Sequence, residues 1–323
     1  MNIAPSRSGS LDARLGHFFL WLVVLLGGVI LMKTNAAAEP GGPRRETWQK
    51  IDRALKEGKP KTAGDLLAGV EQAAIAKQAW AEVARAIATR VLVTNADRPA
   101  DDPQRLVDLD AATAAAPAQA RGVLTAIQAN WTWGFFQANR WRFAQRTTQA
   151  TDGDERDMAE MASWDLRQIV AEINERFAAA LAVEAGLKQL VVADWSMLIE
   201  PGTMGPAYRP TVWDVVVHDG IAFATTGERG LDEPEDAFEL EASSPALADP
   251  TSFSDWQPTA GEVAATDTDS PLLAVIGLYQ QLLAFHADDA DRTAFLAADL
   301  DRLLWAGNAA VADAEAQPQE ALQ

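Results

Sequence analysis

The sequence predicts an all-α protein, an irregular array of antiparallel helix pairs with the character of a bundle or a solenoid. Three observations lead to this fold class. Apolar residues recur every three or four positions from Glu46 onward, and no segment alternates apolar and polar residues between hairpin turns. In addition, 48% of the 323 residues are hydrophobic and eleven residues are tryptophan. Such a chain can bury a substantial core, which excludes wholesale disorder.

Helical spacing and stop signals define the first elements. Trp48, Ile51 and Leu55 lie on one face of a helix, which we expect to end at the Gly-Lys-Pro sequence of residues 58–60. Thr62 is expected to cap the next helix, because its hydroxyl can accept a hydrogen bond from a free backbone amide of the first turn.

Two further helices lead to a long aromatic one. We expect a helix at about residues 78–94, a loop to Pro103 and a short alanine-rich helix to Ala116. Pro117 suits the first turn of the next helix, which we place at residues 117–138. This helix and the segment after it are the most aromatic part of the chain, with Trp131, Trp133, Phe135, Phe136, Trp141 and Phe143.

The helical pattern continues in the second half of the chain. Ser163 is expected to cap the next helix, and a shorter apolar segment covers residues 187–198. An irregular loop at residues 201–210 leads to Thr211, which opens a helix that reaches Phe223.

Composition divides the chain into parts. We expect a helical domain at residues 46–227, an acidic linker at residues 228–270 and a C-terminal helical pair at residues 271–323, with helices near 272–286 and 293–306. No consensus repeats at the period of about 34 residues that marks tetratricopeptide arrays, so a repeat architecture is only an analogy.

The linker prediction depends on charge. Between Gly230 and Asp291 there are fourteen acidic residues and no lysine or arginine. Phe238, Phe253 and Trp256 are its scattered apolar anchors. Because such a composition favours hydration over burial, we expect a solvated segment.

The first 38 residues have the pattern of an export signal. Arg7 and Arg14 precede the apolar run Phe18–Met32, and an Ala-Ala-Ala sequence follows at residues 36–38. A basic region, an apolar region and an A-x-A sequence are typical of a secretory signal peptide. We therefore expect export to the periplasm or cell envelope. The exported part, residues 39–323, has 24 basic and 45 acidic residues and a formal charge of −21.

An uncleaved signal anchor in the inner membrane is the alternative. Fifteen helical residues span only about 22 Å, which is less than the roughly 30 Å of the hydrocarbon core. The uncharged stretch Leu15–Met32 nearly reaches that length. In this alternative, membrane contact is limited to residues 15–33.

Composition also excludes several classes of protein. The chain has no cysteine, which removes disulfide frameworks, thiolate metal sites, cysteine nucleophiles and thioesters. The formal charge of −19 argues against nucleic acid as a partner, because binding phosphates requires a basic surface.

Candidate catalytic and metal-binding residues are few. His218 and Asp219 are adjacent on a predicted helix and point in different directions, so we interpret His218 as a surface histidine. His286, followed by the acidic residues Asp288, Asp289 and Asp291, is interpreted as part of a polar turn, because the spacing lacks the glycine and final glutamate of a calcium loop. We predict no enzyme, no catalytic residue, no metal and no cofactor.

The aromatic segment has two interpretations. Trp131 and Phe135 lie four residues apart, and this helical spacing favours packing against neighbouring helices. The alternative is a binding surface with stacking platforms and polar side chains alongside. Its candidate residues are Asn139, Arg140, Arg142 and Arg146.

Five stretches, in this order, resemble the N-terminal helical region of large bacterial alpha-2-macroglobulin family proteins. No single motif is specific, but their order is hard to obtain by chance. They are WQKIDRALKEGKPKTAGDLLAGV (48–70), NWTWGFFQANRWRFAQRT (130–147), SWDLRQIVAEI (163–173), YRPTVWDVVVHDGIAF (208–223), and LYQQLLAFH (278–286) with DLDRLLW (299–305).

The resemblance implies an envelope protein of a protease-trapping inhibitor family. In that family a bait segment is cleaved and a thioester then tethers the protease, but this chain has no bait region and no cysteine for the thioester. No functional residue is therefore carried over. We expect a truncated gene product or the first segment of a split protein, whose partner is another protein or the missing downstream macroglobulin domains. The alternative is a stand-alone, helical-repeat-like adaptor with a concave groove for a periplasmic or envelope protein.

Overall fold

The structure, a computed structural model, describes residues 44–146, 157–200, 202–227, 237–259 and 270–311, with Val263 and Asp267. Helices dominate this part of the chain, which confirms the all-α prediction, and extended backbone pairs there only in two isolated bridges. The predicted export signal lies outside the described residues. Within them, none of the helices combines the length and the apolar character needed to span a bilayer.

The helices follow one another closely along the chain. The long helices are α1 (Arg45–Lys56), α2 (Pro60–Ala76), α3 (Trp80–Thr94), α4 (Gln104–Ala115), α5 (Ala118–Ala144), α6 (Leu166–Ala182), α8 (Val212–Ala224), α10 (Pro271–Phe285) and α11 (Thr293–Ala309). Two short helices are α7 (Glu184–Leu187) and α9 (Pro250–Asp255). Most predicted helices are therefore confirmed, and α5 is longer than predicted because it continues through Trp141 and Phe143.

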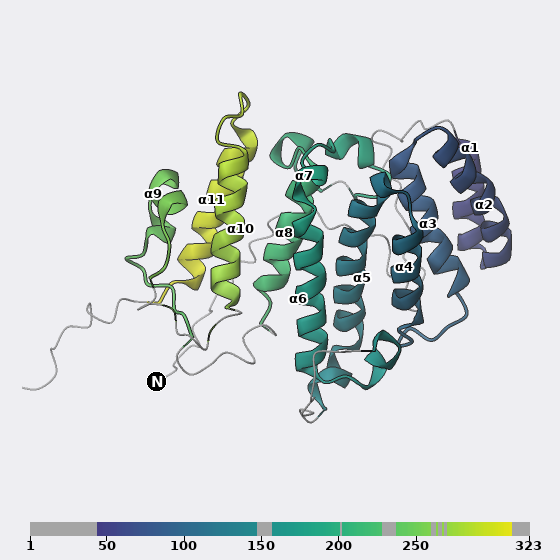
Figure 1. Ribbon diagram of the computed structural model, residues 1–323, viewed down its shortest axis with the longest axis horizontal. Helices are drawn as coiled ribbons and strands as arrows, with labels where there is room; N and C mark the ends of the chain where they lie inside the picture. Colours follow the sequence, from purple (N-terminus) through teal and green to yellow (C-terminus); the bar gives the residue numbers. More distant parts are fainter. Residues whose placement is uncertain are drawn as a thin grey trace, which may run out of the picture.

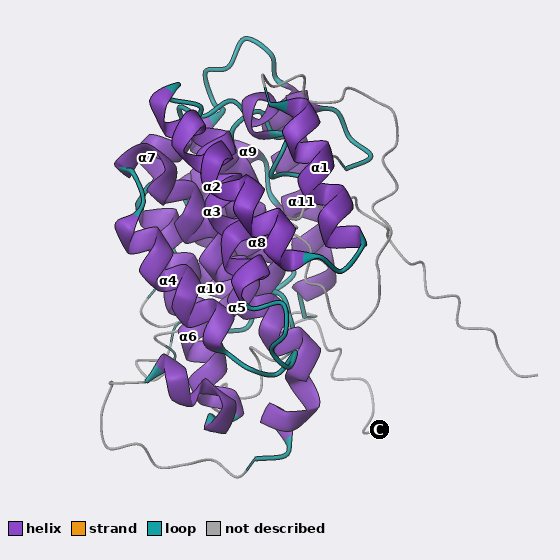
Figure 2. Ribbon diagram, turned by 90° about the vertical axis from the view of Figure 1, so that its right-hand side faces the viewer, coloured by secondary structure: helices purple, strands orange, loops and turns teal. Residues whose placement is uncertain are grey.

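The helices form an elongated array that keeps the order of the sequence. In Figure 1, α1 and α2 lie at one end, α5 and α6 in the middle, and α10 and α11 toward the other end, beside α9. Contacts follow the same order: α3 and α4 pack on α5, α5 on α6, α6 on α8, and α8 on α10. Seen from the α1 and α2 end, the later helices lie behind the first ones (Figure 2).

A small apolar cluster holds α1 to α2 and α3. Ile51 and Leu67 are fully buried in it. Trp48 packs beside them, and its indole N–H donates to Glu82 Oε1 at 2.8 Å. The same carboxylate accepts a hydrogen bond from Arg44 Nε at 2.8 Å. Because Glu82 is itself buried, these two donors satisfy its charge where water has no access.

Helix starts show where local sequence was sufficient and where it was not. Thr211 caps α8, as predicted: Asp214 N donates to its side chain, and the Asp214 carboxylate accepts from Thr211 N. The prediction for Thr62 is wrong, because Pro60 already occupies the first helical turn, where its fixed φ and missing N–H cost nothing. The prediction for Ser163 is also wrong. Asp165 is the cap of α6, in a reciprocal pair with Gln168.

Replacing Asp165 with alanine is expected to destabilise the protein by about 1 kcal/mol, the typical cost of losing a helix cap. The Asp165 carboxylate accepts the Gln168 backbone N–H at 2.9 Å, and this bond would be lost. Ser163→Ala is the matched control, since the Ser163 hydroxyl donates to Glu160 O and caps no α-helix. Urea denaturation followed by circular dichroism measures both variants. Equal destabilisation by the two substitutions would contradict the assignment of the cap.

The acidic segment is not a solvated linker where the structure describes it. Phe238, Leu240 and Phe253 are buried, so the prediction for residues 228–270 is wrong for residues 237–259. Residues 228–236 lie outside the described part. The segment packs on α10 and α11, and the Gln280 side chain donates to the carbonyl oxygens of Phe253 and Trp256 at 2.9 and 2.8 Å. Burial of its aromatic residues therefore outweighs the hydration of its carboxylates.

The same packing connects the two predicted helical parts. α10 lies directly against α8. A Cβ atom added to Gly220 of α8 would lie 3.5 Å from Cδ1 of Leu278 in α10, so the two helices are in contact there. One continuous cluster of buried residues includes side chains from α3 through α11. The residues on either side of the acidic segment thus share a core.

Candidate functional site

The predicted binding surface lies at the C-terminal end of α5, and the structure separates its residues. Asn139 is buried, and its side-chain amide donates to Phe135 O at 2.9 Å, so it contributes to no surface. Arg142 forms an ion pair with Asp101. Arg146 donates to Trp164 O at 2.6 Å and to Ala162 O, and thus connects the end of α5 to the segment before α6.

Most of the aromatic segment is packed inside the protein. Trp131, Phe135 and Phe136 are buried, and the Trp133 ring contacts Phe177 edge-on at 6.1 Å between centroids. The packing interpretation is therefore confirmed for these residues. Trp141 is the exception. Its side chain is 64% exposed, and no other described tryptophan is classed as exposed.

What remains of the predicted surface is small. Arg140 and Trp141 are both exposed, Arg142 pairs with Asp101, and Arg146 donates to Trp164 O. A single exposed ring with one adjacent guanidinium can contact a planar or anionic group. It does not form the row of exposed aromatic rings that a binding surface on this segment would require.

His218 is not the surface histidine that was predicted. Its side chain is largely buried, and its Nδ1 lies 2.7 Å from Asp214 O, one turn earlier in α8. Its Nε2 lies 3.8 Å from Asp301 Oδ2, which belongs to α11. Asp219, the next residue, is buried and accepts from Asn130 Nδ2 at 3.0 Å. The two adjacent residues therefore serve different contacts, as their helical positions require.

His286 is a buried titratable side chain with a partner on each ring nitrogen. It lies at the C-terminal end of α10, is only 2% exposed, and has a carboxylate on each ring nitrogen. Nε2 lies 2.7 Å from Asp214 Oδ1 in α8, and Nδ1 lies 2.7 Å from Asp289 Oδ2 in the following turn. The sequence placed His286 in a polar turn. The structure adds its buried connection to α8.

Two opposing effects act on the proton of His286. Burial alone would lower the pKa of His286, because it disfavours the charged ring. Hydrogen bonds and charge attraction from Asp214 and Asp289 oppose burial and raise the pKa of His286 above its ordinary value. Since both ring nitrogens can donate only in the protonated form, the geometry matches an imidazolium between two carboxylates.

A second polar group lies next to this one and was missed by the sequence analysis. Burial lowers the pKa of Arg209, while nearby Asp301 and Asp219 oppose that effect. Burial and the charge of Asp301 raise the pKa of the Tyr279 hydroxyl. These residues come from the loop before α8, from α8, α10 and α11, so no local spacing could have indicated their proximity.

This polar region joins helices. It contains no described group of three or more histidine or acidic side chains that could hold a metal ion. A hollow of about 170 Å³ beside it is lined by Asp289 and Asp291, with Ala207, Pro210, Ala290 and Ala294, and His286 itself does not line it. The arrangement can hold a proton and fix α8 against α10. The prediction that the chain is not an enzyme stays a prediction.

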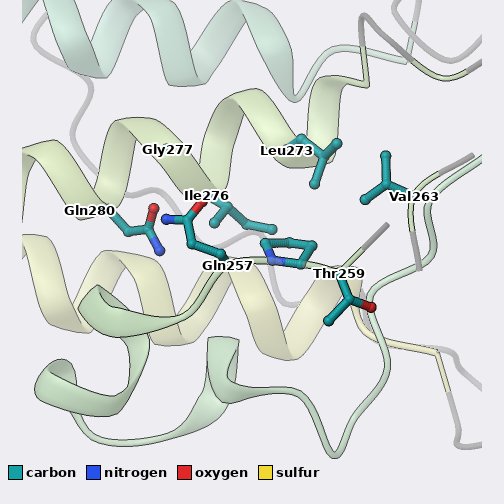
Figure 3. Close-up of a pocket in the computed structure, with 8 residues that line it drawn as sticks. Gln257, Thr259, Val263, Leu273, Ile276, Gly277 and Gln280 are labelled. Carbon is teal, nitrogen blue, oxygen red and sulfur yellow. The ribbon is translucent and has the colours of Figure 1, made fainter. Parts of the chain in front are cut away.

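A second hollow lies between α10 and the acidic segment. It measures about 470 Å³, and Leu273, Ile276 and Gly277 of α10 form one wall. Figure 3 shows Gln257, Thr259 and Val263 on the other side. The Gln280 amide at its edge already donates to two backbone carbonyls, so the hollow offers apolar contact and few polar groups for recognition.

The fold and these contacts define the class of protein only as an all-α helical array. Comparison with protein-family models, with curated proteins and with solved structures gives no match to this chain. The likeness to the alpha-2-macroglobulin family thus remains a prediction from the sequence motifs.

Proposed function

We propose that this chain is an exported, non-catalytic helical module, similar to the N-terminal helical region of alpha-2-macroglobulin-like envelope proteins. It acts by presenting surfaces to a protein partner or to downstream macroglobulin domains. The export proposal rests on the basic residues, the apolar run and the A-x-A sequence of residues 1–38. The family proposal rests on the five ordered motifs, and the proposed architecture is a series of antiparallel helix pairs.

One contact supports the motif argument more than any other. The fourth motif contains Asp214, the first part of the fifth ends at His286, and the two side chains meet at 2.7 Å in a buried position. Residues that lie 72 positions apart in the chain thus form one joint. Motifs whose polar residues join helices are what a family of similar helical folds would retain, since a buried charge needs its partner.

The other motifs also coincide with structural joints. The first spans α1, its turn at Gly58, where φ is +67°, and α2. The third contains Asp165, the cap of α6. Because these residues determine where helices begin and end, their role supports a likeness in fold and assigns no catalytic role.

The stand-alone adaptor is less well supported. It requires a groove lined by Asn139, Arg140 and Arg142 with several exposed tryptophans. Asn139 is buried, and among the described tryptophans only Trp141 is well exposed. These observations favour a packed module over a groove that binds extended peptides.

Fusion of alkaline phosphatase to the C-terminus tests export, because that reporter is active only where disulfides form. We expect activity with the complete chain and its loss when residues 1–38 are deleted. Sequencing the N-terminus of the mature protein then distinguishes cleavage from anchoring. An inactive fusion of the complete chain, present at normal abundance, would show that the export proposal is wrong.

The non-trapping part is tested with an endoprotease and two substrates, one small peptide and one large protein. Trapping would protect the large substrate and leave the small one accessible. We expect both cleavage rates to stay the same when the chain is added, since it has no cysteine for a thioester. Selective protection of the large substrate by this chain alone would contradict the proposal.

A further inference from the structure

An uncharged leucine face lies on the outer side of α11, near one end of the array. Leu296, Leu300 and Leu304 are 60%, 56% and 42% exposed. They follow at intervals of four residues, so they lie on one side of the helix. The opposite side, with Ala294, Ala298, Arg302 and Ala306, is buried. We call the three exposed leucines the leucine face.

The leucine face is a continuous feature rather than a set of scattered side chains. Thr293, Ala297 and Gly307 occupy the same side of the helix, so it carries no charge between its first and last turns. The nearest carboxylates along the helix are Asp299 and Asp301. Asp299 pairs with Arg302, and Asp301 lies near His218. Large contiguous exposed apolar patches mark interaction sites, whereas singly exposed apolar side chains are ordinary.

The surroundings of the leucine face are acidic. The described residues between 237 and 311 include ten acidic residues and only two basic ones, Arg292 and Arg302. Arg302 is buried, whereas Arg292 is exposed, stacks over Phe295 at 3.8 Å and donates to Ala287 O. Arg292 is thus the only exposed lysine or arginine among the described residues of this stretch, and the exposed carboxylates outnumber it. The excess of carboxylates can attract a base.

The carboxylates lie at both ends of the helix. Asp288, Asp289 and Asp291 are exposed just before α11, and exposed Glu241 pairs through its backbone with Val311, just after it. The leucine face thus lies between two acidic edges. A partner that covers it must supply apolar side chains in the middle and positive charges at its margins.

We infer that the leucine face binds an amphipathic helix whose apolar stripe is bordered by lysine or arginine. This inference rests on the proposed function, because it names the surface that the module presents. Docking of an amphipathic helix along an apolar helix face uses side chains at three- and four-residue intervals, which is the spacing of the three leucines.

A second copy of this chain does not fit the same description. Each copy has a formal charge of −19, and two acidic margins would repel each other. The basic surface of α1 on a second copy does not match the expected partner either, because it exposes no apolar stripe beside its basic residues. Exposed Lys50, Arg53 and Lys56 cover its outer side, while Trp48 and Ile51 are buried inward.

Designed peptides test the inference on the purified chain without knowledge of the natural partner. The probe is a helical peptide of about 18 residues with leucines on one face and lysines elsewhere. Its two controls are a shuffled peptide of identical composition, in which the leucines no longer share a face, and a leucine/glutamate version. Fluorescence anisotropy measures the three affinities. We expect the amphipathic basic peptide to bind at least about tenfold more tightly than either control, since only it offers both features.

Variants locate the binding. The triple substitution Leu296→Gln, Leu300→Gln and Leu304→Gln removes the apolar side chains and keeps a residue of high helix propensity. We expect it to weaken binding at least about tenfold, because the buried apolar area is lost. Val191→Gln is the matched control, since Val191 is 53% exposed on another part of the molecule. Circular dichroism verifies that each variant is folded.

Several results would overturn the inference. Equal affinity for the basic and shuffled peptides would show attraction by charge alone, and unchanged affinity in the triple variant would show binding elsewhere. Dimerisation that the triple variant abolishes would identify a second copy as the occupant. Stronger binding to neutral phosphatidylcholine vesicles than to the peptide would identify a lipid surface. None of these results depends on export or protease trapping, so the inference and the proposed function can fail separately.

Discussion

Replacing Arg302 with methionine is expected to lower the free energy of unfolding by about 3–5 kcal/mol, the range for removing one partner of a buried ion pair. Arg302 is fully buried and donates to Ala246 O at 2.6 Å and Ala248 O at 3.0 Å. Its Nε also donates to Asp299 at 3.0 Å. Methionine fills much of the volume of the arginine side chain. The loss of stability therefore reports on these hydrogen bonds rather than on a cavity.

The effect should be greatest in the acidic segment. Arg302 lies over the Phe253 ring at 4.6 Å and holds the backbone just before α9. Loss of these contacts should increase amide hydrogen exchange at residues 245–255 more than in α1. Arg53→Met, on the exposed side of α1, is the control and should change stability by no more than about 0.5 kcal/mol. Similar effects of the two substitutions would contradict the role of Arg302.

His286→Asn is expected to destabilise the protein by about 1.5–3 kcal/mol at pH 6, the range for hydrogen bonds to charged groups. The folded-state pKa of His286 is raised above its unfolded value near 6.5, so protonation stabilises the folded state. That contribution is fully present below the unfolded pKa and is lost as the pH rises through the folded pKa. The difference between wild type and variant should therefore shrink toward alkaline pH.

Urea denaturation across a pH series measures this difference. Asp289→Asn removes one of the two carboxylates on the ring and should lower the pH at which the contribution disappears. Asp288→Asn changes the same charge one residue away, at an exposed carboxylate, and serves as the control. A pH-independent difference between wild type and His286→Asn would show that His286 does not titrate against Asp214 and Asp289.

The helices of this protein were predictable because each one repeats a local apolar pattern. Trp48, Ile51 and Leu55 indicated α1, and the buried side of α5 followed from the spacing of Trp131 and Phe135. Helix starts were predictable only in part. Ser163 and Asp165 both have side chains suited to capping, and only the path of the backbone selects Asp165.

The candidate sites were less predictable. Asn139 was expected at a surface, but its amide turns back onto the α5 backbone inside the core. The sequence analysis placed His286 in a polar turn, whereas its partner Asp214 was included only as one residue of the fourth motif. The pairing of these two side chains depends on how α8 packs against α10. The spacing of residues within either helix does not predict that packing.

By itself, the sequence determined the all-α class, the approximate extent of most described helices and the apolar sides that they bury. These are properties of short segments, since helical periodicity repeats within a few residues. Only the tertiary structure decided that the acidic segment packs around buried Arg302, that His286 joins α8 to α10 and that the leucine face remains uncovered. The physical reason is that burial of a charge, or exposure of an apolar face, depends on contacts between helices far apart in the chain.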